Sequence, residues 1–489
     1  MITRVVYVFK NFFLNFTAGD VKTEVTVDEP ENDFYLARIT VSGCTLRVVF
    51  ARTGPREVPS EMVLVDPGDR KERRLYCRFS VREVHGEPLA ASPAKGGVLV
   101  TCDHGQDGAV TLSFGVNIID EVFSSLSAVE EWERESAGEK VHPYYLGDPG
   151  DSRGEPHVDD FYNLFCESLN AALGSAGSSV RVQRKLPNFN ISLTHDVDVL
   201  EKNLFSTLRY AAFPLYYSVR HLDISSFKKI ITYVRGPRNL NYIAEISGAE
   251  AMLGFRSTFF LYAGVTKKSL WQKIIDLGIN PLYSISDEKL AGTVEAIRAA
   301  GLEIGFHSSF SAAYDGELME KEYALLRKTF RKDIISCRNH FLNFSITRTP
   351  LILEKIGIKC DTTFHYNNRS GFLRHETCSP FYIYSHAEKR ILDVIEFPTA
   401  VTDSTLYNYS HFSPEQALAH SLAVLEKANG RRGAVCINWH NETAAAEYGW
   451  HATYREILHW IKKNNFSTYT VGELYRILTA EGSSVEFSY

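Results

Sequence analysis

The stretch Ile191-Ser-Leu-Thr-His-Asp-Val-Asp198 decides the fold, because it is an apolar run that ends in two carboxylates one residue apart. If the run is a β-strand, its side chains alternate between two faces, so Asp196 and Asp198 share one face, opposite Val197. Two carboxylates at the end of a buried strand repel each other and lose hydration unless a cation or a shared proton relieves them. A single Asp at a strand end often only caps a helix or closes a turn, but the pair predicts a metal beside a general base.

The bulk composition is that of a soluble globular protein. The chain has 489 residues, which exceeds the usual size of a single core and predicts two domains. A net charge of -6 and the lack of any recognition motif argue against a nucleic-acid partner. The chain start resembles no signal peptide and no stretch is apolar enough to span a membrane, so we expect a cytoplasmic protein. The eight cysteines lack CxxC spacing and are therefore expected to be reduced thiols.

The chain divides into two parts by pattern. Residues 1–150 are predicted to form a strand-rich α+β accessory domain, since short β-branched runs alternate with turn residues there. A helical pattern follows within it at 118–134. Residues 151–185 are predicted to form a linker and a helix, because Gly, Pro and Asp precede an apolar stripe. Nothing before Arg181 shows a cluster of catalytic side chains.

Residues 186–485 alternate between strand and helix patterns, which predicts a (β/α) barrel or an open α/β sheet. Strands are expected at 190–197, 255–262, 303–307, 334–338, 359–362, 394–397 and 434–439. Helices are expected at 287–300, 318–330, 347–356, 414–428, 453–463 and 471–479. In such folds the reactive groups come from the carboxyl ends of the strands.

Ionisable side chains do stand at the predicted strand ends. His307 closes one strand and His440 another, each on the face opposite the large apolar side chains. Arg338 and His340 follow a third strand and share one side of it. A single His is more often a structural residue than a ligand. Several strands that each end in an ionisable side chain, on the face opposite their large apolar residues, favour a common site at one end of the sheet.

Four short motifs along the chain contain these ionisable residues. They are Thr194-His-Asp-Val-Asp198, Glu303-Ile-Gly-Phe-His-Ser-Ser309, Cys337-Arg-Asn-His-Phe341 and Asn438-Trp-His-Asn-Glu442. In this order they resemble the polysaccharide deacetylase superfamily, the NodB-homology domain of carbohydrate esterase family four. With the Gly371–Phe381 segment, the chain most resembles a bacterial branch that carries a similar N-terminal domain.

The resemblance implies a distorted (β/α) barrel and a set of roles. Asp196 would be the base that activates water, and Arg338 would hold it in place. Asp198 and His307 would bind a divalent metal, with zinc the ion that the resemblance implies, and His440 would protonate the leaving amine. The physics suits these roles, because a metal lowers the pKa of its water and a His near neutrality can donate a proton.

One departure affects the metal site. The family usually has a second His four residues after the first, and here that position is Ser311. Asp198 and His307 alone fall one short of the three protein ligands that a catalytic zinc usually has. His340 is the better candidate for the third ligand, with a substrate contact as the alternative. His195 should point away from Asp196 by strand phase and serve in packing or support.

Substrate contacts are expected from Arg374, Asn438 and Trp439. The aromatic and basic stretch 201–241 suggests a peripheral membrane contact or a phosphate-bearing ligand, although helices with a solvated charged face are the favoured explanation. The resemblance of the four motifs implies that the protein removes the N-acetyl group from a sugar in a surface polysaccharide or its precursor. The alternatives are a catalytically impaired, carbohydrate-binding relative and an amidase for a substrate that is not a sugar.

Overall fold

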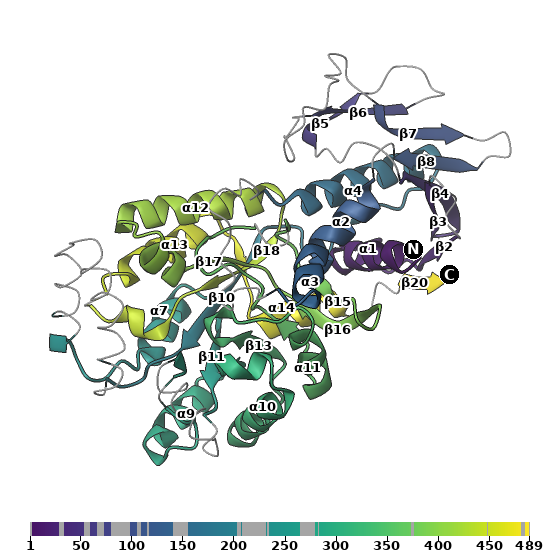
Figure 1. The fold of residues 1–489 in the computed structure, drawn as a ribbon. Helices are drawn as coiled ribbons and strands as arrows, with labels where there is room; N and C mark the ends of the chain where they lie inside the picture. The colour runs from purple at the N-terminus through teal and green to yellow at the C-terminus, as the bar shows by residue number, and fades with distance from the viewer. Residues whose placement is uncertain are drawn as a thin grey trace.

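The computed structural model has two parts, a curled sheet wrapped by helices and a second sheet joined to it by helices from the N-terminal region (Figure 1). It describes residues 2–28, 34–52, 59–65, 73–79, 98–104, 109–114, 117–139, 155–202, 207, 231, 234–264, 279–281, 283–372, 376–446, 448–480 and 485–488.

The larger part is built on a curled sheet with parallel central strands. Its strands are β10 (Asn190–Val197), β11 (Ser257–Tyr262), β12 (Glu303–Ser308), β13 (Ser336–Asn339), β14 (Cys360–Asp361), β15 (Phe381–Ser385), β16 (Arg390–Glu396), β17 (Thr399–Thr402), β18 (Ala434–Asn438) and β19 (Ser467–Thr468). Their order across the sheet is β15-β16-β14-β13-β12-β11-β10-β18-β17, with β19 beside β10 and β15 antiparallel to β16. All residues of β10 and β11 are buried, as expected for parallel strands covered on both faces.

Helices surround this sheet (Figure 1). They are α7 (Ile243–Met252), α9 (Ala291–Ala299), α10 (Gly316–Phe330), α11 (Thr349–Ile356), α12 (Pro414–Gly430), α13 (His451–Lys463) and α14 (Val471–Thr479). Shorter turns are η1 (Glu288–Leu290), η2 (Phe310–Ala313), η3 (His340–Leu342), η4 (Thr405–Tyr409) and η5 (Asn441–Ala444). Ser413 and Thr470 each form a capping box, which satisfies the first amides of α12 and α14. The predicted distorted (β/α) barrel is thus confirmed, as a curled sheet whose edges are β15 and β17.

The N-terminal part is strand-rich, as predicted. Its sheet has the order β20-β2-β3-β4-β8-β7-β6-β5. The bounds are β2 (Thr23–Val27), β3 (Phe34–Val41), β4 (Cys44–Ala51), β5 (Pro59–Val65), β6 (Arg73–Phe79), β7 (Val98–His104), β8 (Val110–Phe114) and β20 (Val485–Ser488). The helices are α1 (Ile2–Asn15), α2 (Ile118–Ser127), α3 (Val129–Ser136) and α4 (His157–Ser175), and β1 (Phe16–Thr17) pairs with β9 (Gln183–Arg184). The single helix expected at 118–134 is broken at Ala128, which has a positive φ of 50°.

Two features tie the parts together. Helix α1 packs against the edge strand β15, where the Tyr7 hydroxyl donates to the Tyr382 carbonyl at 2.7 Å and Asn15 donates to the Pro380 carbonyl at 2.8 Å. Strand β20, at the end of the chain, joins the N-terminal sheet parallel to β2. The last described strand of the chain therefore lies beside one of the first. Helices α1 and α2 of the accessory part therefore pack against the β15 edge of the larger sheet.

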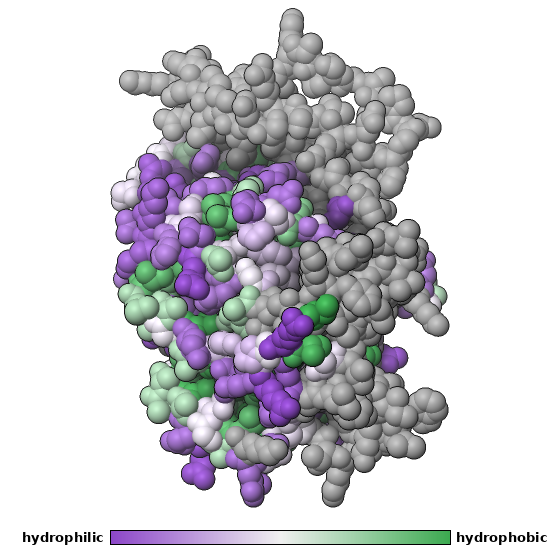
Figure 2. Space-filling model, turned by 90° about the vertical axis from the view of Figure 1, so that its left-hand side faces the viewer, coloured by the Kyte–Doolittle hydropathy of each residue, from purple (hydrophilic) through white to green (hydrophobic). Residues whose placement is uncertain are grey.

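The remaining bulk predictions concern the surface and the thiols. On the face in Figure 2, hydrophilic and hydrophobic residues are interspersed. Within the described ranges, none of the helices combines the length and the apolar character that a bilayer crossing requires. The cysteines of the described part form no disulfide.

Candidate active site

The ionisable groups expected at strand ends meet at one end of the parallel sheet. Strands β13, β12, β11, β10 and β18 are neighbours in that order, so their carboxyl ends share one edge. Asp196 and Asp198 come from the end of β10, and His307 comes from the end of β12. His340 directly follows β13, and His440 lies two residues after the end of β18. Segments far apart in the sequence thus deliver acids and imidazoles to the same place.

Asp198, His307 and His340 form a compact group that could hold a metal ion. The Nε2 atom of His307 lies 3.2 Å from Oδ1 of Asp198, and Nδ1 of His340 lies 3.4 Å from the same oxygen. The two nitrogens are 3.0 Å apart. Ligands at about 2.0–2.2 Å from one tetrahedral ion lie about 3.3 Å from each other, so this spacing fits a divalent cation. The third donor comes from His340, in place of a side chain at Ser311.

Backbone carbonyls orient both imidazoles toward this group. Nδ1 of His307 lies 2.8 Å from the Arg338 carbonyl, and Nε2 of His340 lies 2.9 Å from the Ile279 carbonyl. A carbonyl only accepts, so these nitrogens donate, and in neutral rings the two nitrogens that face each other carry lone pairs. Oδ1 of Asp198 is buried and has no hydrogen-bond partner in the described part of the chain. Three acceptors this close repel one another unless a cation lies among them, which favours a metal.

The charges of the group agree with a ligand role. Burial raises the pKa of the Asp198 carboxyl, but His340 and His307 outweigh it and hold that pKa well below its usual range. Burial lowers the pKa of His307, but Asp196 and then Asp198 outweigh it and raise that pKa, so binding of a metal would displace the proton from the ring. Asp198 is therefore ionised, the form in which a carboxylate binds a metal.

Asp196 lies near the Asp198, His307 and His340 group, and each of its two carboxylate oxygens accepts a hydrogen bond. Nη1 of Arg338 donates to Oδ1 at 3.1 Å, and Nδ2 of Asn438 donates to Oδ2 at 2.9 Å. Burial raises the pKa of Asp196, but Arg338, then His307 and His440, outweigh it, so the pKa lies below the usual value of 3.8. The amide of Asn438 thus positions Asp196, and the substrate contact expected of Asn438 stays a prediction.

Arg338 is itself rigidly placed. It is fully buried and donates to the hydroxyls of Thr194 at 2.9 Å and Thr399 at 3.2 Å. Its guanidinium lies 4.7 Å from the centre of the Phe260 ring. A Cβ at Gly305 would come within 2.3 Å of that ring, so strand β12 needs glycine there. This packing fixes the cation that keeps Asp196 ionised.

His440 has a carboxylate partner that sequence reasoning missed. Nδ1 of His440 lies 2.7 Å from Oδ1 of Asp403, and Oδ2 of Asp403 accepts from the His440 amide and from the Thr443 hydroxyl, both at 2.9 Å. Burial lowers the pKa of His440, but Asp403 outweighs it, so the pKa lies well above 6.5. The free edge of the ring, Nε2, is 3.9 Å from Oδ2 of Asp196 and 3.7 Å from Oδ2 of Asp198.

Asp403 directly follows the short strand β17, at the same sheet edge as the other groups. The sequence Thr399-Ala-Val-Thr-Asp403 has the pattern of an apolar run that ends in an acid, as β10 does. That pattern is the signal that could have identified it.

The other predicted residues lie elsewhere. Trp439 is fully buried and stacks on Tyr454 at 5.2 Å, so it packs the core and has no surface for the expected substrate contact. His195 points away from Asp196, as predicted, and its two ring nitrogens lie 2.8 Å from the Trp439 carbonyl and 2.8 Å from Glu250. Arg374 and most of the 201–241 stretch are outside the described residues, so the substrate and membrane contacts expected there stay predictions.

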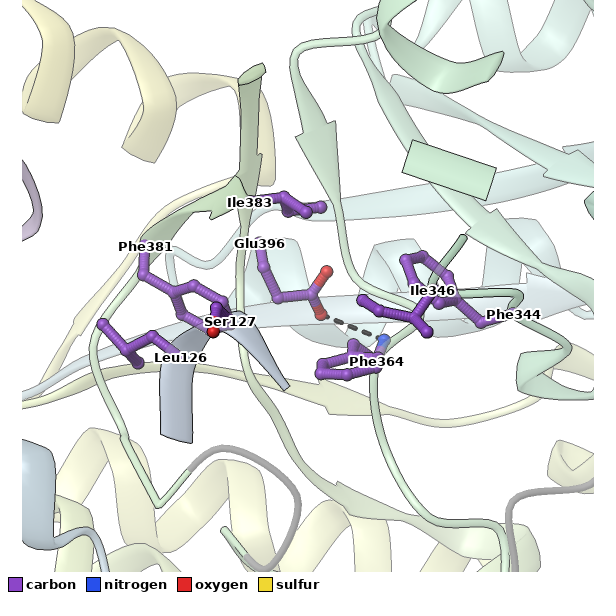
Figure 3. Close-up of a pocket in the computed structure, with 8 residues that line it drawn as sticks. All are labelled: Leu126, Ser127, Phe344, Ile346, Phe364, Phe381, Ile383 and Glu396. Carbon is purple, nitrogen blue, oxygen red and sulfur yellow. Dashed lines mark hydrogen bonds between the residues drawn. The ribbon is translucent and has the colours of Figure 1, made fainter. Parts of the chain in front are cut away.

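An apolar hollow lies away from this cluster (Figure 3). Leu126 of α2, Phe381 and Ile383 of β15 and Glu396 of β16 line it, and Glu396 accepts from the Phe364 amide at 3.0 Å. None of the acids and histidines described above borders it. The candidate active site is therefore the cluster at the strand ends and not this hollow.

Comparisons with known proteins add little to this geometry. The chain matches no protein-family model and no curated protein. A solved Mycobacterium smegmatis structure assigned as a polysaccharide deacetylase is 14% identical, covering 61% of this chain and 93% of its own, with a TM-score of 0.40. The Puue allantoinase is 11% identical over 60% of this chain and 92% of its own, with a TM-score of 0.38. Agd3, described as a novel carbohydrate deacetylase, is 9% identical over 95% of this chain and 69% of its own, with a TM-score of 0.31. Likenesses at this level establish neither a family nor an activity.

Proposed function

We propose that this protein is a metal-dependent hydrolase that removes the acetyl group from an N-acetylated sugar. One observation carries the proposal. The group of Asp198, His307 and His340 lies next to an ionised acid held by Arg338 and to a histidine held by Asp403. A base, an acid and three metal-ligand atoms on one sheet edge are the parts that amide hydrolysis needs.

We assign separate roles in amide hydrolysis to the residues of the site. When bound by Asp198, His307 and His340, a divalent metal would polarise the amide carbonyl and lower the pKa of water. Asp196 accepts the proton of the attacking water, because its low pKa leaves it ionised. His440 donates a proton to the leaving nitrogen from Nε2, because its raised pKa keeps the ring protonated at neutral pH.

The substrate class rests on the four sequence motifs that resemble sugar deacetylases. Their order along the chain and the placement of their acids and histidines at one sheet edge support the same class. An N-acetylated hexosamine within a polysaccharide, or a precursor of one, is the substrate that we infer. Zinc is the metal that we infer, since two imidazoles and one carboxylate are a common set for it.

The test combines metal analysis with acetate release. Purified protein is dialysed, its divalent metal content is measured, and acetate is assayed with N-acetylglucosamine oligomers and with linear acetamides. The proposal expects bound metal and acetate from the sugars. Acetate or ammonia from the linear amides alone would identify a general amidase, and protein that neither binds metal nor releases acetate would refute the proposal.

A further inference from the structure

Glu442 is a buried acid of the site region that the mechanism above does not use. It lies in η5, two residues after His440, and only 8% of its surface is exposed. Its Oε2 atom is buried and finds no hydrogen-bond partner among the residues that the structure describes. Buried polar atoms are nearly always paired, so an unpaired carboxyl oxygen at this place points to a missing ligand.

Glu442 lies two residues after His440, in the turn that follows β18 at the carboxyl end of the sheet. The charges of His440, Asp198 and Asp403 all act on its carboxyl group. It is not a member of the group that could bind a metal. It is not the partner that orients His440 either, because Asp403 already holds that ring at Nδ1.

We propose that Glu442 is a specificity-determining residue that hydrogen-bonds a ring hydroxyl of the sugar next to its acetamido group. This inference rests on the proposed function. A hydroxyl satisfies a buried carboxyl oxygen, whereas an aliphatic ring of the same size leaves it unpaired, and sites of this kind discriminate strongly between the two.

The test compares two acetamides that differ in their hydroxyls. N-acetylglucosamine oligomers carry ring hydroxyls, and N-cyclohexylacetamide presents the same acetamido group on a bare six-membered ring. The readout is the ratio of kcat/KM for the two compounds, measured for wild type, Glu442→Leu and Glu442→Gln. The Leu variant should lower the preference for the sugar about 10- to 100-fold, and Gln, which keeps polar atoms, should restore part of it.

The control variant is Glu303→Gln, which changes a half-buried acid at the opposite, amino end of β12. Glu303 accepts from the Gly472 amide at 2.9 Å. Its other hydrogen-bond partners in the described part of the chain, Thr258, Ser336 and Thr470, lie outside the site. This substitution should leave the ratio unchanged. An equal loss on both compounds in Glu442→Leu, or no loss on either, would overturn the inference.

A binding measurement separates this inference from the proposed function. Titration calorimetry follows the sugar oligomer binding to Asp196→Asn protein, with and without Glu442→Leu. If wild type hydrolyses the sugar but both proteins bind it equally, only the Glu442 inference fails. If wild type releases no acetate but the Leu variant weakens sugar binding about 10-fold or more, only the proposed hydrolysis fails. Absence of both hydrolysis and binding refutes both.

Discussion

Replacing Asp403 by Asn tests how the chain prepares its general acid. The substitution keeps the shape of the side chain and an acceptor for Nδ1 of His440, but it removes the negative charge 2.7 Å away. Coulomb's law with an effective dielectric constant of ~20 gives a gross attraction of about 6 kcal/mol for this pair. Burial of the imidazolium opposes that attraction, so a net loss of about 1.4–2.7 kcal/mol is expected, which corresponds to a 10- to 100-fold lower rate.

The assay is the pH dependence of kcat/KM for acetate release. His440 acts as an acid in its protonated form, so activity is lost as pH rises through its pKa. Asp403 raises that pKa, and its removal should therefore move the alkaline limb to lower pH while the metal content stays unchanged. Thr443→Val is the matched control, because it removes a donor to Asp403 at 2.9 Å but keeps the charge. An alkaline limb that does not move in Asp403→Asn would refute the reasoning.

Three further substitutions test other parts of the site. Asp196→Asn should abolish acetate release while metal analysis finds the metal still bound, and loss of the metal would make Asp196 a ligand. His340→Ala should lower the metal occupancy measured after dialysis, since it removes one of three donor atoms, and full occupancy would exclude it from the set. Gly305→Ala should lower the free energy of unfolding by about 1–3 kcal/mol in a denaturant titration, because its methyl group would overlap the Phe260 ring. An unchanged midpoint would mean that β12 and Phe260 shift apart freely.

The part of the site that could be predicted from the sequence follows mostly from the alternation of side chains between the two faces of a strand. Alternation in β10 puts Asp196 on the face opposite His195, and the structure shows His195 turned toward Glu250. The same rule puts Trp439 on the face opposite His440, where it is indeed buried. The expected substrate contact of Trp439 required it to lie on the same face as His440, and the alternation correctly predicts the opposite face.

What the sequence could not predict depends on neighbours that are distant along the chain. Strand β17 is a short buried strand without alternation, so only the acid that ends the Thr399–Thr402 run distinguishes it from a loop, a weak signal for Asp403 by itself. The role of Asn438 required knowing that β18 pairs with β10, which brings its amide to Asp196. The pairing of β20 with β2 joins strands more than 400 residues apart in the sequence, and neither segment alone indicates its partner.

The most direct test of the account is anomalous X-ray diffraction at the zinc edge from crystals grown with zinc. The account predicts a peak at about 2.0–2.2 Å from Oδ1 of Asp198, Nε2 of His307 and Nδ1 of His340. A peak at another place in the molecule, with those three atoms still in contact with one another, would contradict it.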